Sequence, residues 1–182
     1  MRVLFLLFIL STTYAQAKPL LPVDTILDHA ENVLKFPDPK LLASIAKVES
    51  SWNPAATNHH KGITYYGLMQ ISYGTAHMMG YRGKPQDLMN WKTNIKWASK
   101  YLQYLSEEHL TYRDVVASYN AGTVIMCKYK CPKGHLVNEK YVKDVMGVYN
   151  NLSGEGLADG QVFHQKLAFK VLIREDWKKY NL

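Results

Sequence analysis

The chain has 182 residues, of which 47% are hydrophobic and 20% are charged, and this is the profile of one soluble globular domain with a short appendage. No stretch after residue 17 is apolar enough to span a membrane, so no membrane-spanning helix is expected once those residues are removed. The net charge of +7 indicates attraction to anionic cell-surface polymers or to nucleic acid, and charge alone does not choose between them.

Residues 1–17 have the build of a cleaved secretory signal. Arg2 precedes an apolar stretch over residues 3–10, and small residues follow at Ala15 and Ala17. We predict cleavage after Ala17, an exported protein in the periplasm or outside the cell, and no stable membrane anchor after cleavage. An uncleaved anchor is the alternative, although the apolar stretch is short for one.

Apolar residues recur at helical spacing through most of the remaining chain, so we expect a mainly α fold with at most minor β structure. The predicted elements are a helix over 24–35, a helix that starts at Pro39 after the N-cap Asp38 and ends near Ser50 or Ser51, a loop over 53–66, a short helix capped by Ser72 and ended by Gly80, a helix over 91–108, a helix ended by Gly122, and a helix over 141–149 capped by Asn138.

The C-terminal part adds two features. Cys127 and Cys131 lie four residues apart. In an oxidising compartment we favour a disulfide between them and leave two free thiols open, since a metal site would need further ligands. After the glycines of residues 154–160, the apolar pattern of the tail fits either a strand or a helix.

One carboxylate lies on the apolar face of the second predicted helix. Glu49 follows Ala46, Ile45 and Leu42 by 3, 4 and 7 residues, so all four side chains share a face. Burial penalises the charged form and raises the pKa of a carboxyl group, as a general acid near neutral pH requires. The alternative is a glutamate that simply reaches water at the end of the helix.

Four sequence blocks then occur in order, with helices between them: ESSWNPAA, YGLMQIS, ASYNAG and NEKYVKDVMGVY. Together they resemble the catalytic domain of the soluble lytic transglycosylases, which shares its core with goose-type lysozyme. The resemblance implies a lysozyme-like helical fold, with Glu49 as catalytic acid and then base. It also implies a substrate groove that involves the remaining block residues: Ser50, Gly67, Met69, Gln70, Tyr119, Asn120 and Tyr141.

With this resemblance the chain divides into a signal over 1–17, an N-terminal helix and linker over 18–37, a lytic transglycosylase catalytic domain over 38–150, and a C-terminal extension over 151–182.

The chain departs from the family pattern at three places. Asn58 stands where a serine is common, nine residues after the glutamate. Because asparagine still donates a hydrogen bond, we expect its substrate-binding role to be weakened or redirected. Tyr66, with Tyr65 beside it, replaces a small residue and would narrow the groove or add a stacking surface. Trp97 replaces a small residue in the long helix, so local packing must differ.

A glycosidase normally uses two carboxylates, whereas the blocks supply only Glu49. The resemblance resolves this shortage: the acid protonates the glycosidic oxygen between N-acetylmuramic acid (MurNAc) and N-acetylglucosamine (GlcNAc), and then activates the C6 hydroxyl of the same MurNAc. We therefore expect a peptidoglycan lytic transglycosylase that forms 1,6-anhydromuramoyl ends, needs no cofactor or metal, and takes glycan strands as partner.

Other functions stay open. A lysozyme-type hydrolase would need a second acid such as Asp87 or Asp114, and a non-catalytic wall-binding scaffold would keep the groove without turnover. Nucleic acid is not an expected partner, because the lysines are scattered along an exported chain. His59 and His60 are adjacent in a polar loop without a third ligand, so we expect them to be solvated. Small enzymes of this type often open the wall for a secretion or conjugation apparatus, which is the protein partner the resemblance suggests.

Overall fold

A computed structural model describes residues 20–109, 111–126 and 134–153 of the chain, and most of these residues are helical. The predicted signal, both cysteines and the extension beyond residue 153 lie outside these residues. The elements in chain order are α1 (Val23–Asp28), the π-helix η1 (His29–Val33), α2 (Pro39–Ser50), β1 (Thr57–His60), β2 (Ile63–Tyr66), β3 (Ile71–Ser72), α3 (Tyr73–Met78), the 3-10 helix η2 (Pro85–Met89), α4 (Trp91–Glu108), α5 (Tyr112–Ala121) and α6 (Glu139–Ser153).

The mainly α class is confirmed, and so are several predicted helix boundaries. The Asp38 side chain accepts a hydrogen bond from the Leu41 amide at 3.2 Å, and Ser72 accepts one from the Thr75 amide at 3.0 Å. These are the N-caps of α2 and α3. Gly122 ends α5 in the left-handed conformation at φ 78°, which glycine adopts without a steric penalty.

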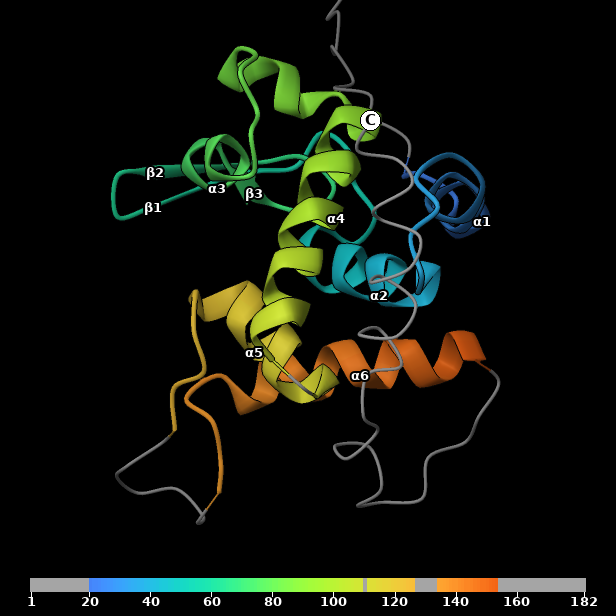
Figure 1. The fold of residues 1–182 in the computed structure, drawn as a ribbon. Coiled ribbons are helices and arrows are strands. Elements are labelled where there is room, and N and C mark those ends of the chain that lie inside the picture. The colour runs from blue at the N-terminus through green and yellow to red at the C-terminus, as the bar shows by residue number, and fades with distance from the viewer. Residues whose placement is uncertain (1–19, 110, 127–133, 154–182) are drawn as a thin grey trace, which may run out of the picture.

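The long helix α4 runs through the middle of the molecule, α5 packs on it, and α6 lies across the end of this pair beside α2 (Figure 1). The core lies between these four helices. Its fully buried members include residues from each of them: Leu42, Ile45, Ile95, Leu102, Val116 and Val142. None of the described helices combines the length and the apolar character needed to cross a membrane.

Buried Asp38 joins three helices at the far end of α2 from Glu49. Besides capping α2, its carboxylate accepts hydrogen bonds from the hydroxyls of Tyr112 on α5 and Tyr149 on α6, at 2.5 Å and 3.0 Å. Three donors therefore satisfy a carboxylate that would otherwise be costly to bury.

The predicted loop over 53–66 is wrong for most of its length, because β1 and β2 form an antiparallel hairpin that pairs with β3 in a three-stranded sheet. Lys61 and Gly62 connect the strands with φ of 49° and 78°, as in the type I′ turn that matches strand twist. All four residues of β1 are exposed and polar. The strand therefore lacks the alternation of polar and apolar residues that indicates a strand in a sequence. The turn of the hairpin projects beyond α3, while β2 contacts α3 (Figure 1).

Two further residues singled out in the sequence are Trp97 on α4 and Asn138 before α6. Trp97 packs at the end of α3, with its ring 5.5 Å from that of Tyr81, so the local packing does accommodate a large residue. Asn138 precedes α6, but its side chain does not cap that helix, because its Oδ1 accepts no hydrogen bond among the described residues. Its Nδ2 instead donates to the Ala117 carbonyl of α5 at 2.9 Å.

Candidate active site

The last turn of α2 carries Glu49, whose Oε1 accepts a hydrogen bond of 2.6 Å from the Tyr141 hydroxyl. Tyr141 lies 92 residues later, in the first turn of α6, so the packing of α6 on α2 brings the pair together. Ser51 ends α2 in the left-handed conformation at φ 55°, which turns the chain away immediately after the acid.

Burial dominates the electrostatics of this pair. It raises the pKa of Glu49 from its ordinary 4.5 to about 7, against the opposing effect of the Tyr141 hydrogen bond. No charged side chain of the described residues contributes to this shift. The pKa of Tyr119 is raised well above 10 by burial and, next, by the charge of Glu49. Glu49 therefore lies near Tyr119. With a pKa of about 7, its carboxyl group can hold or release a proton near neutral pH.

A tight loop between β2 and β3 holds the Gly-Leu-Met-Gln block. Gly67 adopts φ +65°, and a Cβ there would lie 2.8 Å from the side-chain nitrogen of Asn94. That buried amide comes from α4 and donates to the carbonyls of Tyr66 and Leu88 at 2.6 Å and 2.8 Å, while its oxygen accepts from the Met69 amide at 2.7 Å. Asn94 thus fixes the loop, and only glycine fits against it.

Sequence reasoning missed Asn94, although a signal was present. Its position lies three residues after Trp91 and four before Ala98, within the apolar stripe of α4. A polar side chain at such a position must find partners when it is buried. The same argument singled out Glu49.

Several predicted substrate-binding residues form hydrogen bonds within the protein. Ser50 donates to the Leu68 carbonyl at 2.7 Å, Tyr119 donates to the Met69 carbonyl at 2.8 Å, and the Gln70 amide donates to the Gly67 carbonyl at 2.8 Å. Gly67 and Met69 are buried, so they shape the loop and do not contact a ligand through a side chain. Gln70 has φ 46°, a further sign of a tightly constrained loop.

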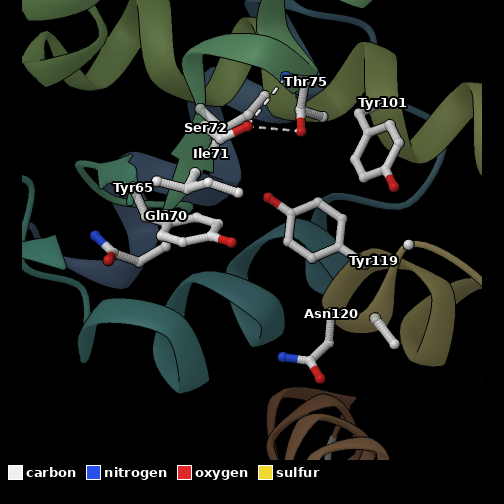
Figure 2. A pocket seen from close by; sticks show the side chains of 11 residues that line it. Tyr65, Gln70, Ile71, Ser72, Thr75, Tyr101, Tyr119 and Asn120 are labelled. Atoms are coloured by element: carbon white, nitrogen blue, oxygen red, sulfur yellow. Dashed lines mark hydrogen bonds between the residues drawn. The ribbon is translucent and has the colours of Figure 1, made fainter. Parts of the chain in front are cut away.

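A cleft of about 260 Å³ opens beside this loop. Its wall includes Tyr65 from β2, Thr75 from α3, Tyr101 from α4, and Tyr119 and Asn120 from α5. Figure 2 shows the rings of Tyr65 and Tyr119 on opposite sides of the cleft, with their hydroxyls turned toward each other. Aromatic faces edged by hydroxyls and an amide suit a ligand with both apolar and polar surface, such as a sugar.

The two predicted asparagines differ in position. Asn58 is exposed on β1, where it pairs with Tyr65, and it is not among the residues that line the cleft. Asn120 is exposed at the cleft, and its Oδ1 accepts a hydrogen bond of 3.0 Å from the Nδ2 of Asn138. Because the Asn120 Oδ1 already accepts this hydrogen bond, its Nδ2 group remains available to donate to a ligand in the cleft.

The two alternative acids have structural partners of their own. Asp87 accepts a hydrogen bond of 3.3 Å from the Lys84 amide, and Asp114 accepts one of 2.8 Å from the Thr111 hydroxyl. Neither residue lines the cleft; Glu49 and Tyr141 do not line it either, but both lie near Tyr119, which does. In the exposed hairpin, His59 bonds through Nδ1 to the Thr64 hydroxyl at 2.9 Å.

Known proteins with a similar sequence belong to one family. Residues 32–142 match the transglycosylase SLT domain. The membrane-bound lytic murein transglycosylase E of Buchnera aphidicola is 32% identical over 105 residues, which cover 50% of this chain and 46% of that protein. The soluble lytic murein transglycosylase of Salmonella typhimurium is 38% identical over 87 residues, which cover 43% of this chain and 13% of that protein. The chain thus spans less than half the length of both relatives.

The fold is also found in solved structures. The 70 kDa soluble lytic transglycosylase of Escherichia coli superposes with a TM-score of 0.54 at 20% identity, over 79% of this chain and 26% of that one. A complex of the 70 kDa soluble lytic transglycosylase with bulgecin A gives the same TM-score at 21% identity and the same coverage. The expected lysozyme-like helical fold is therefore confirmed.

Proposed function

The chain belongs to the transglycosylase SLT domain family, and on this premise we propose that it is a peptidoglycan lytic transglycosylase that cleaves the β-1,4 bond between MurNAc and GlcNAc. The observation that carries the proposal is Glu49, a mostly buried carboxyl group near Tyr119 of the cleft wall, whose pKa is raised to about 7. A protonated carboxyl at neutral pH is the group that a departing sugar oxygen requires.

The proposed reaction uses this carboxyl group twice. Glu49 first gives its proton to the glycosidic oxygen, and the bond from that oxygen to C1 of MurNAc breaks. The Glu49 carboxylate, stabilised by the Tyr141 hydroxyl, then takes the proton of the C6 hydroxyl. The C6 oxygen forms a bond to C1, which yields a 1,6-anhydro ring and returns the proton to Glu49. Because the C6 hydroxyl belongs to the same sugar, it has a high effective molarity and takes the place of water as the nucleophile, so no water is consumed.

The surroundings of Glu49 favour this route over hydrolysis with two carboxylates. Asp87 and Asp114, the alternative second acids, are engaged with Lys84 and Thr111, and neither contributes to the pKa shift of Glu49. Within the described residues, the cleft itself is lined by neutral side chains. A two-carboxylate mechanism needs the second group within about 5–10 Å of the first, across the scissile bond.

Digestion of purified peptidoglycan followed by mass spectrometry tests the proposal. We expect muropeptides one water lighter than hydrolytic products, formed by the wild-type protein and absent with Glu49→Gln. Asp87→Asn and Asp114→Asn serve as matched controls and should keep the activity. Hydrolytic products would indicate a muramidase instead, and no products at all from folded wild-type protein would indicate a non-catalytic scaffold.

We further propose that the protein acts outside the cytoplasm and opens the wall for a secretion or conjugation apparatus. The N-terminal signal pattern and the small catalytic domain support this role. N-terminal sequencing of the exported protein should begin at Lys18. In a deletion strain, the wild-type gene should restore secretion or conjugation, and the Glu49→Gln gene should not.

A further inference from the structure

A row of three aromatic rings leads from the neighbourhood of Glu49 to the surface of α4. Tyr119 lines the cleft, and its ring centroid lies 5.6 Å from that of Tyr101, which also lines the cleft. Tyr101 in turn stacks with Tyr104, with centroids 6.3 Å apart and planes only 14° from parallel. Because 101 and 104 are three residues apart on a helix, α4 itself sets this contact.

The outer end of the row is open. Tyr104 is 43% exposed, whereas Tyr101 is only 9% exposed. The stacking contact fixes the plane of the exposed ring, so a ligand that binds there need not first order a mobile side chain. Tyrosine also loses little side-chain entropy on binding, because it has only two side-chain dihedrals.

The size of the cleft gives a reason for a ligand to reach this ring. Its volume of about 260 Å³ lies below the range of about 300–1,000 Å³ typical of pockets that enclose a whole small molecule. A polymeric glycan strand bound in the cleft must therefore continue beyond it. Tyr104 is not among the residues that line the cleft, but its ring stacks on Tyr101, which is one of them.

We propose that Tyr104 is a distal sugar-binding residue, which stacks on a pyranose ring of the glycan strand outside the cleft. The C–H groups on one face of such a ring provide an apolar surface that matches an aromatic side chain. This inference rests on the proposed function, because it takes a peptidoglycan glycan as the ligand. Its consequence is a preference for long strands over short ones.

Calorimetric titration of the Glu49→Gln protein tests the inference without turnover. The probes are peptide-free disaccharide and octasaccharide of alternating GlcNAc and MurNAc. Adding Tyr104→Ala should weaken binding of the octasaccharide about five- to tenfold and leave the disaccharide unchanged, while Tyr104→Trp should keep the affinity. Gln103→Ala, at the neighbouring position of α4, is the matched control, and a thermal melt verifies that each variant is folded.

Two results would overturn the inference: an octasaccharide affinity that does not respond to Tyr104→Ala, or an equal loss for both sugars. If wild-type protein forms anhydro products while either result is found, only the role of Tyr104 fails. If neither sugar binds and no product forms, the proposed function fails together with it.

Discussion

Replacement of Glu49 by glutamine should stabilise the protein at alkaline pH. Burial raises the pKa of Glu49 from 4.5 to about 7. Between these values the unfolded chain has already lost the proton that the folded protein keeps, so the free energy of unfolding falls as the pH rises. At about 1.4 kcal/mol for each pH unit, the loss reaches about 3 kcal/mol and is complete above pH 7.

Glutamine removes this penalty because it stays neutral. Its side-chain oxygen can still accept the hydrogen bond of the Tyr141 hydroxyl, which the carboxylate accepts at 2.6 Å. In urea unfolding, Glu49→Gln and wild type should therefore have similar stability near pH 4, and the variant should be more stable by about 3 kcal/mol near pH 8.5. Glu107→Gln, on the exposed face of α4, controls for the loss of one negative charge.

A stability difference that stays constant from pH 4 to pH 8.5 would refute this reasoning, and so would a variant that is less stable than wild type at high pH. Either result would mean that water solvates the Glu49 carboxylate in the folded protein. The proposed acid would then lack the raised pKa on which its role depends, whatever the products of digestion show.

Tyr141→Phe removes the hydroxyl that stabilises the carboxylate, so the pKa of Glu49 should rise above 7 and the alkaline limb of the pH–activity profile should move up by about one pH unit; an unmoved limb contradicts this. Asn94→Leu removes the partner of three backbone groups, two of them in buried bonds, and should cost about 3–5 kcal/mol in urea unfolding; a cost below about 1 kcal/mol would mean that the loop has other support. Asn138→Asp replaces the donor to Asn120 with an acceptor and also removes the donor to the Ala117 carbonyl. The Asn120 amide should therefore reverse, the free energy of unfolding should fall, and KM for peptidoglycan should rise severalfold with kcat of the folded protein nearly unchanged; a loss of kcat with unchanged KM would argue against this positioning role.

The sequence predicted the helices well because their ends carry local signals. Asp38 and Ser72 cap the helices they were assigned to, and Gly122 ends α5. Such signals depend on backbone geometry within a few residues, and tertiary packing did not override them. Glu49 was singled out for a similarly local reason, its position on an apolar helix face.

What the sequence did not predict depends on contacts between distant segments. The hairpin has an exposed strand at 57–60, which carries no alternating pattern for sequence analysis to detect. Asn138 was a reasonable N-cap, yet its side chain turns to the Ala117 carbonyl, a choice set by the packing of α5 against α6. The 2.6 Å contact of Tyr141 with Glu49 could be expected only from family resemblance, because spacing along one helix says nothing about another.

The bonds of α2 with α6 also set the alignment of these two helices along their length. Glu49, at the end of α2, bonds to Tyr141 at the start of α6, while Asp38, at the start of α2, bonds to Tyr149 further along α6. The helices therefore run in opposite directions and are fastened at two points. A slip by a single residue would displace α6 by about 1.5 Å and lengthen both bonds at once. The distance between Glu49 and Tyr141 thus depends in part on the contact of Asp38 with Tyr149 at the opposite end of α2.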